Sequence, residues 1–342
     1  MELGERKQRI LAAIIDEYIR TGEPVGSKVI VERLDHAVSS ATIRNEMADL
    51  AAMGYLEQPH TSAGRIPTAP AFRLYIDHLM RRRPLPEESR QDIDHLLEGA
   101  ASDPDRLIEG ASQALAATTG CAAVSTPPVD QEAFIHRIEL MPMEGRSLAL
   151  LLMTGAGTLR TRVCRTEQRL SEEVLQRLSR ALSETFLHRP VGEISLADVQ
   201  GVMLSLGENG LACAPVLTAF YELIQEAAAA DVLLTGQLNL LQHPDYELSN
   251  ARALLHFLAR RDLVADMLTA YPGGLRVVLG NESHRPELSG SSIIITRYAL
   301  GDGVSGAIGL IGPLRMDYAS TIPRLEYFAK SLGRLLTELL EE

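Results

Sequence analysis

Residues 38–68, VSSATIRNEMADLAAMGYLEQPHTSAGRIPT, predict a helix that is followed by a small β-hairpin. Ser39 is a favourable N-cap, because its hydroxyl accepts a hydrogen bond from a free backbone N–H group of the first turn. Gly54 is placed to end the helix, because glycine adopts the left-handed conformation without a steric penalty. One apolar stripe at helical spacing marks the buried face: Ile43, Met47 and Leu50. The hairpin then runs from Tyr55 to a tip rich in Gly, Ser and Arg, and returns to Thr68.

A different face of this helix carries small and hydrogen-bonding side chains, namely Ser40, Ala41, Arg44, Asn45 and Ala48. Recognition helices of DNA-binding proteins place their N-terminal residues against base edges. In the major groove, arginine pairs with O6 and N7 of guanine, and asparagine pairs with N6 and N7 of adenine. We therefore predict a set of DNA-contacting residues in and around the helix: Ser39, Ser40, Thr42, Arg44, Asn45, Lys28 and, at the hairpin tip, Arg65.

Two shorter helices, expected over residues 6–20 and 27–34, precede this helix. Three helices of this length bury little apolar surface by themselves, so the hairpin is expected to close the domain. Three helices followed by a small basic hairpin predict a winged helix-turn-helix domain over residues 1–83.

Two groups of arginines in this domain have more than one interpretation. Arg65 contacts phosphate or the minor groove, or it pairs with Glu57 inside the hairpin. Arg81–Arg83 follow a fourth helix that begins at Pro70. These three cations either stabilise the negative end of the helix dipole or contact phosphate.

The chain carries a net charge of −12, which is unusual for a DNA-binding protein. Residues 1–83 contain 12 Lys and Arg against 11 Asp and Glu, so their net charge is +1 and that of the remainder is −13. The acidity therefore lies outside the predicted DNA-binding domain, where it lowers non-specific affinity for DNA. We expect six cations on the DNA side and three carboxylates facing away: Arg6, Lys7, Arg9, Lys28, Arg44 and Arg65, against Glu17, Asp49 and Asp77.

The remaining residues predict an α+β arrangement with an insertion. Strands are expected over 134–140, 148–153, 159–163, 276–279, 292–298 and 306–311, with helices over 171–187 and 322–340. Residues 190–270 are mainly helical, most clearly at 214–230 and 249–268. We therefore expect residues 84–189 and 271–342 to form one domain, into which residues 190–270 are inserted.

Two motifs closely resemble one known family, the heat-inducible transcription repressors of bacteria (HrcA). The first is GEPVGSKVI, residues 22–30, followed by the run from Ser39 to Thr68; the second is GAIGLIGPLRMDY, residues 306–318. The resemblance implies an N-terminal winged helix-turn-helix domain, a GAF-like α/β domain and a mainly helical dimerisation domain inserted in the GAF-like domain.

The resemblance also implies a function. Members of such a family act as cytoplasmic homodimers that bind double-stranded DNA at an inverted-repeat operator, of the CIRCE type, upstream of chaperone operons. The chaperonin GroEL is implied as a partner that maintains the active repressor, and heat shock releases the genes by diverting the chaperonin to unfolded proteins. The alternative is a winged-helix regulator that is controlled by a small-molecule effector in its GAF-like domain.

Dimerisation is also expected from the size of the DNA-binding domain. One winged helix reads only a few base pairs, whereas two copies related by a two-fold axis read an inverted repeat. The apolar face expected to mediate this contact lies on the helix 214–230: Val216, Phe220, Leu223, Ile224 and Ala227.

No constellation of residues predicts an enzyme, a metal site or a cofactor site. Residues 301–306 spell G-x-G-x-x-G, but strands are expected on both sides, so a hairpin turn is predicted instead of a dinucleotide site. The three cysteines, Cys121, Cys164 and Cys213, are too far apart for a zinc site and are expected to be buried thiols in a reducing compartment. No apolar run reaches the roughly 18 residues that predict a membrane span, so no membrane contact is expected.

The second family motif, Gly306–Tyr318, has two interpretations. It forms a ligand pocket or a contact between domains, or it is the end of an edge strand that an ion pair fixes. For the second interpretation, Arg315 is the candidate to pair with a carboxylate.

Overall fold

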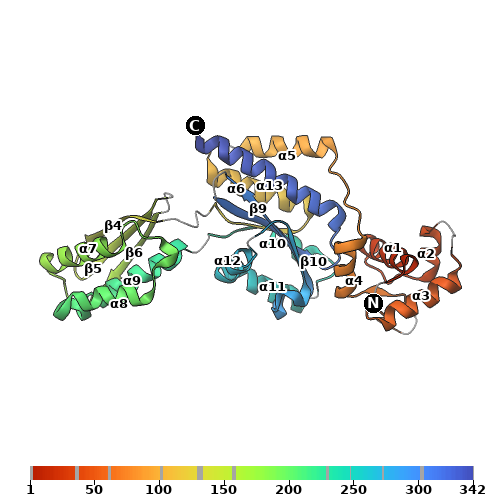
Figure 1. Ribbon diagram of the computed structural model, residues 1–342, viewed down its shortest axis with the longest axis horizontal. Helices are drawn as coiled ribbons and strands as arrows, with labels where there is room; N and C mark the ends of the chain where they lie inside the picture. The colour runs from red at the N-terminus through yellow and green to blue at the C-terminus, as the bar shows by residue number, and fades with distance from the viewer. Residues whose placement is uncertain are drawn as a thin grey trace. The chain divides into compact units, whose positions relative to one another are not determined.

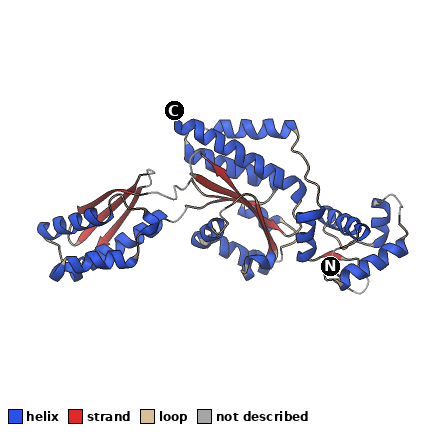
Figure 2. Ribbon diagram, in the orientation of Figure 1, coloured by secondary structure: helices blue, strands red, loops and turns tan. Residues whose placement is uncertain are grey.

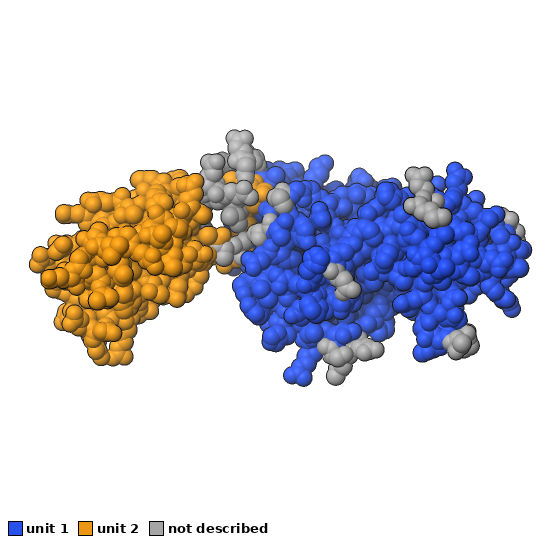
Figure 3. All heavy atoms as spheres, turned by 60° about the horizontal axis from the view of Figure 1, so that its bottom comes forward, with its two compact units in different colours: residues 1–126, 232–300, 306–342 blue, residues 127–231, 301–305 orange. Residues whose placement is uncertain are grey.

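The computed structural model describes residues 3–34, 38–60, 63–100, 103–128, 134–155, 159–228, 231–246, 248–271, 273–300 and 304–341. The chain forms two compact units. The first comprises residues 1–126, 232–300 and 306–342, and the second comprises residues 127–231 with 301–305 (Figure 3).

The first unit begins with the predicted winged helix-turn-helix domain (Figure 1). Its elements are α1 (Glu5–Thr21), α2 (Ser27–Arg33), α3 (Ser40–Ala52), β1 (Leu56–Glu57), β2 (Ile66–Pro67), α4 (Ala69–Leu74) and one π-helical turn, η1 (Tyr75–Leu79). The predicted apolar stripe of α3 is buried, and it packs with Ile10 and Ile14 of α1. The local signals for α3 are confirmed: the Ser39 hydroxyl accepts a hydrogen bond from the N–H of Thr42 at 3.2 Å, and Gly54 has a φ of +82°.

The wing is fixed to the loop between α1 and α2, which the sequence did not predict. Strands β1 and β2 are antiparallel, and beyond them Val25 and Arg65 form a further bridge with two backbone hydrogen bonds of 2.9 Å. Gly64 permits this contact, since a Cβ there would lie 2.5 Å from the carbonyl of Val25. The base of the wing is therefore part of the domain.

The rest of the first unit, which we call the body, is built on a five-stranded sheet in the order β7-β3-β10-β9-β8. The strands are β3 (Ala122–Ser125), β7 (Leu233–Thr235), β8 (Arg276–Leu279), β9 (Ser291–Ala299) and β10 (Ser305–Pro313). Three of them, β8, β9 and β10, fall where strands were expected, but β3 and β7 were not predicted. Strand β3 holds only four residues, two of them alanines, so its composition gives a weak strand signal.

Helices cover both faces of this sheet (Figures 1 and 2). On one face lie α5 (Glu87–Ala100), α6 (Pro104–Thr119) and α13 (Tyr318–Glu341); on the other lie α10 (Gln237–Gln242), α11 (Leu248–Ala259) and α12 (Arg261–Thr269). Neighbouring residues of β9 alternate between the two cores, with Ile294 in the first and Ile293 and Ile295 in the second. The helix expected over 249–268 is broken at Arg260, which has a ψ of 86°.

The second unit packs three helices on a three-stranded antiparallel sheet. Its elements are β4 (Ile135–Pro142), β5 (Ser147–Thr154), β6 (Leu159–Arg165), α7 (Glu172–Phe186), α8 (Leu196–Ser205) and α9 (Gly210–Ala228). The expected limits of the insertion, 190–270, do not match this unit. Its strands and its helices share one core, whereas residues 232–270 belong to the body. The unit is also a mixture of strands and helices, because the sheet needs α7 and α9 to cover its apolar face.

The apolar face of α9 is buried inside the second unit by this packing. Val216, Phe220, Leu223 and Ile224 are completely buried against the sheet, so the face expected to form a dimer interface is internal core. The opposite face of the sheet is open instead. There, Leu159 and Val163 are 52% and 62% exposed, and Val163 pairs across the strands with Ala149, which in turn pairs with Met141.

Candidate nucleic-acid interface

The exposed face of α3 carries the two residues predicted to read bases. Arg44 and Asn45 are both exposed, and neither side chain makes a hydrogen bond or an ion pair with any residue that the structure describes. Ala41 and Ala48 are exposed beside them, and their short side chains leave Arg44 and Asn45 projecting from the helix surface. A recognition helix needs this arrangement, because the helix axis must come close to the base edges.

The three predicted hydroxyl residues hold the N-terminal end of α3 in place. The hydroxyls of Ser39 and Thr42 lie 2.9 Å apart, and that of Ser40 lies 3.2 Å from the hydroxyl of Ser27 at the start of α2. Lys28, the next residue of α2, is exposed. The structure thus brings Lys28 and the start of α3 to neighbouring positions, with Arg44 and Asn45 one turn further along.

Arg65 lies on the wing, but its guanidinium is engaged within the hairpin. It donates a hydrogen bond to the side-chain oxygen of Gln58, and not to Glu57, the partner considered from the sequence. Residues 61–62 of the predicted tip lie outside the described residues.

Two of the cations expected on the DNA side form ion pairs with α3, although the Arg6 side chain stays 64% exposed. Nε of Arg6 lies 2.7 Å from a carboxylate oxygen of Glu46, and Nζ of Lys7 lies 2.8 Å from Glu46 and 2.9 Å from Asp49. Glu46 is buried on the inner face of α3. The ammonium group of Lys7 and then the guanidinium of Arg6 hold the pKa of Glu46 below its ordinary value. These residues therefore join α1 to α3, and their contact with DNA stays a prediction.

The arginines that follow η1 attach the winged helix to the body. Arg82 pairs with Glu326 at 2.8 Å, and Arg83 pairs with Asp317 at 2.6 Å. Asp317 lies directly before α13, and Glu326 lies in its third turn. This network favours a structural role for Arg82 and Arg83 over phosphate contact.

The Gly306–Tyr318 motif makes a second attachment. Strand β10 lies in the middle of the sheet, so the edge-strand interpretation was wrong. The predicted ion pair is confirmed: Nε of Arg315 lies 2.5 Å from a carboxylate oxygen of Asp245. The same guanidinium donates to the carbonyl of Ile19 at 3.2 Å and covers Gly22, the residue that ends α1.

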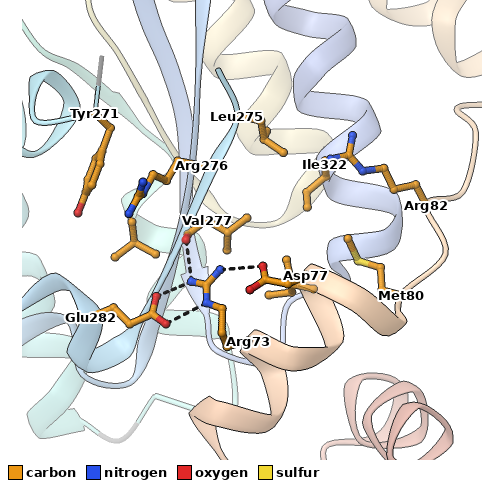
Figure 4. Close-up of a pocket in the computed structure, with 12 residues that line it drawn as sticks. Arg73, Asp77, Met80, Arg82, Tyr271, Leu275, Arg276, Val277, Glu282 and Ile322 are labelled. Atoms are coloured by element: carbon orange, nitrogen blue, oxygen red, sulfur yellow. Dashed lines mark hydrogen bonds and ion pairs between the residues drawn. The ribbon is translucent and has the colours of Figure 1, made fainter. Parts of the chain in front are cut away.

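A cavity of about 700 Å³ lies where η1 meets β8 (Figure 4). Arg73 lines it, and its guanidinium donates to Glu282 at 2.9 Å, to Asp77 at 3.3 Å and to the carbonyl of Val277 at 2.8 Å. On the opposite wall the guanidinium of Arg276 lies 4.9 Å from the ring centroid of Tyr271.

Other predicted features fall as follows. Strands β9 and β10 flank the G-x-G-x-x-G sequence as expected, although residues 301–303 lie outside the described residues. Cys121 and Cys213 are buried, Cys164 is half-buried, and burial raises the pKa of the Cys121 thiol to about 11.

Within the described part of the chain, no group of three His, Cys, Asp or Glu residues is placed to hold a metal ion. Among the same residues, no helix combines the length and the apolar character that a membrane span requires.

Comparison with known proteins covers nearly the whole chain. Residues 2–78 match the family model described as the winged helix-turn-helix transcription repressor HrcA DNA-binding domain, and residues 105–322 match the HrcA protein C-terminal domain. The heat-inducible transcription repressor HrcA of Acetivibrio thermocellus is 32% identical over 99% of this chain and 98% of its own. That of Clostridium botulinum strain Alaska E43 is 33% identical over 98% of both chains.

A solved structure has the same fold. The crystal structure of a protein described only as hypothetical superimposes with a TM-score of 0.60 and 27% identity, over 99% of this chain and all of that one. No activity is assigned to that protein, so it supports the architecture alone. The two family models and the full-length relatives place this chain in the family of heat-inducible transcription repressors, HrcA.

Proposed function

We propose that the chain acts as a dimeric repressor that binds an inverted-repeat operator of the CIRCE type upstream of chaperone operons. The observation that carries this proposal is the surface of α3, where Arg44 and Asn45 are exposed, have no partner among the described residues and are flanked by alanines. Arginine and asparagine so placed recognise guanine and adenine in the major groove.

The other predicted site residues have supporting roles in this proposal. Ser39, Ser40 and Thr42 fix the start of α3, where backbone N–H groups and hydroxyls also suit a phosphate. Lys28 and Arg65 supply phosphate contacts on either side of the helix, and they add affinity without reading sequence.

Dimerisation is proposed to use the open face of the β4-β5-β6 sheet in place of α9. A row of apolar side chains crosses that face, from Met141 through Ala149 to Val163. Two such faces buried against each other give an isologous contact, which matches the two-fold symmetry of an inverted repeat. We propose that the body corresponds to the GAF-like domain, supported by its antiparallel sheet with helices on both faces.

Control by heat is the remaining part of the proposal. Relatives at 32–33% identity carry the description heat-inducible, which supports release of repression on heating. The family resemblance supports the chaperonin GroEL as the partner that maintains the active repressor and is titrated by unfolded proteins during stress.

A footprint on chaperone-operon promoters tests this function. The wild-type chain should protect both arms of an inverted repeat, and added chaperonin should increase the protected fraction at a fixed repressor concentration. The double variant Arg44→Ala, Asn45→Ala should lose that protection although it folds normally. Equal protection of unrelated promoters by the wild-type chain would contradict the proposal.

The cavity in Figure 4 supports a second candidate, a regulator that is controlled by a small-molecule effector. Its volume is in the range of ligand sites, and guanidinium groups line it beside the Tyr271 ring. Native mass spectrometry of the purified chain tests this candidate. A stoichiometric small molecule that Arg276→Gln removes would support it, and a chain that carries no adduct yet binds its operator fully would contradict it.

A further inference from the structure

A second, larger hollow lies on the winged helix and is not explained by contact between α3 and DNA. It has a volume of about 970 Å³, and five arginines line it: Arg9, Arg20, Arg33, Arg81 and Arg83. We call it the arginine groove. Its wall is formed by α1, the end of α2, the residues after η1 and the segment that leads into α13.

The groove lies on the face of α1 that points away from α3. Lys7 marks the side of α1 that faces α3, because its ammonium group contacts Glu46 and Asp49. In a helix of 3.6 residues per turn, Asp16 is rotated by about 180° from Lys7, and Arg9 and Arg20 lie within roughly 40° of that opposite direction. All three line the groove. DNA held by α3 therefore leaves the groove accessible.

The arginines of the groove are held in place by few carboxylates. Buried Glu17 binds both Arg20 and Arg33, the latter with hydrogen bonds of 3.0 and 2.6 Å, and Asp317 binds Arg83. Arg9 and Arg81 are exposed, and neither has a carboxylate partner among the described residues.

The wall of the groove therefore concentrates positive charge in an otherwise acidic chain. It holds five arginines against two aspartates, Asp16 and Asp317, in a chain whose net charge is −12. Of the two aspartates, Asp16 also accepts a hydrogen bond from the hydroxyl of Tyr75. A concave surface of one sign focuses its field and attracts a ligand of the opposite sign.

Part of the lining of the groove is apolar, and we call this part the floor. Small and aliphatic side chains from three segments form it: Ala12, Ala13, Ile19, Leu34 and Leu79. A DNA or RNA backbone presents phosphates and sugars but no aliphatic side chains to pack on such a floor, whereas a peptide supplies carboxylates and aliphatic side chains together.

We propose that the arginine groove binds an acidic, amphipathic segment of a partner protein. Carboxylates of the segment pair with the guanidinium groups of the groove. Those of Arg20, Arg33 and Arg83 are already held in place by Glu17 and Asp317. The aliphatic side chains of the segment cover the floor. The occupant contacts α1 of the winged helix together with Asp317 and Ala319 of the body, so it joins the two parts while α3 stays free for DNA.

The test uses a fluorescent 16-residue peptide made of alternating Glu-Glu and Leu-Leu pairs. Its anisotropy is titrated with the full chain, in parallel with matched peptides that carry Gln or Lys in place of Glu. The acidic peptide should bind at least tenfold more tightly than the Gln peptide, and the Lys peptide should not bind. The double variant Arg9→Glu, Arg81→Glu should weaken binding of the acidic peptide at least tenfold.

A matched double charge reversal on α7 of the second unit, Arg177→Glu with Arg180→Glu, changes the net charge equally and should leave binding within twofold. A random 20-base-pair duplex is titrated on the same proteins, and its affinity should be within twofold for the groove variant and the α7 variant. Acidic-peptide binding that survives the groove reversal would overturn the proposal. A selective loss of duplex affinity in the groove variant would instead assign the groove to nucleic acid. Neither result depends on which operator the repressor reads, so the proposed function is tested separately.

Discussion

The guanidinium of Arg315 covers Gly22, although the two residues are almost the whole chain apart. Gly22 ends α1 in the left-handed conformation, with a φ of +73°, and a Cβ on it would lie 2.9 Å from two atoms of the guanidinium. The Arg315 side chain is only 12% exposed and also binds Asp245 and the carbonyl of Ile19. The second family motif therefore fixes where the winged helix sits on the body.

Gly22→Ala should lower the free energy of unfolding in two ways. The left-handed conformation costs an L-residue about 1–2 kcal/mol, and the added methyl group displaces Arg315. Gly54→Ala is the matched control, since Gly54 has a φ of +82° but nothing within 4 Å of its Cβ position. Urea unfolding should show a greater loss for Gly22→Ala than for Gly54→Ala. In an Arg315→Ala background the two losses should become equal, and a difference that persists would contradict the role given to Arg315.

Glu17 should make the stability depend on pH. The guanidinium of Arg20, and then that of Arg33, hold the pKa of this buried carboxyl below its ordinary value. A carboxyl whose pKa is lower in the folded state stabilises the fold above its unfolded pKa, and this contribution is lost as pH falls towards the folded pKa. Glu17→Gln should therefore destabilise the domain by about 1–3 kcal/mol at pH 7, and by progressively less below about pH 4.5. Glu57→Gln, on the exposed wing, is the control. A Glu17→Gln difference that is constant from pH 7 to pH 3 would rule out this mechanism.

Arg44→Ala and Asn45→Ala should each reduce discrimination between operator and random DNA by about 1–3 kcal/mol. Affinity for random DNA should change much less, because base contacts contribute little to it. Competition binding gives the affinity for operator DNA and the affinity for random DNA. Ala48→Ser is a nearby control, because it adds only a small side chain to the same face of α3. Equal losses on both DNAs would reassign these residues to the phosphate backbone.

Arg65→Ala should reduce the slope of log affinity against log salt by about one unit, if the guanidinium leaves Gln58 to contact phosphate. Gln58→Ala frees the same guanidinium without removing its charge, so it should preserve the slope. An unchanged slope in Arg65→Ala would confine Arg65 to the structure of the hairpin.

Val163→Glu should convert the proposed dimer into a monomer, because two carboxylates would be buried at the centre of the contact. Light scattering reports the mass directly. Leu204→Glu is the matched control, since Leu204 is 76% exposed on α8 and lies away from the open sheet face. A dimeric Val163→Glu protein would move the interface elsewhere.

The sequence was informative where the signals are local. The N-cap at Ser39, the helix end at Gly54 and the buried stripe of α3 all depend on residues a few positions apart, and each is confirmed. The exposure of Arg44 and Asn45 follows from the same periodicity. Their contact with DNA stays a prediction.

Features that depend on distant partners were missed. Strand β3 is in the sheet because β10 and β7 flank it, and its four residues alone do not predict a strand between two others. Arg6 and Lys7 pair with the buried Glu46 of α3, which lies 40 and 39 positions later in the chain. The limits of the second unit could not be placed from periodicity, because α9 and α11 are both apolar helices and only their packing assigns them to different cores.

The order of the strands in the body sets an order of assembly during translation. Strand β10 lies between β3 and β9, yet it follows every other strand in the chain. Until it leaves the ribosome, β3 and β9 each present an unpaired edge, and α13, the helix that packs on β9, is also still to be made. Exposed strand edges invite pairing with other chains. The nascent body is therefore vulnerable to aggregation for most of its synthesis. The three helices and the wing of the DNA-binding domain, in contrast, are already complete before synthesis of the body begins.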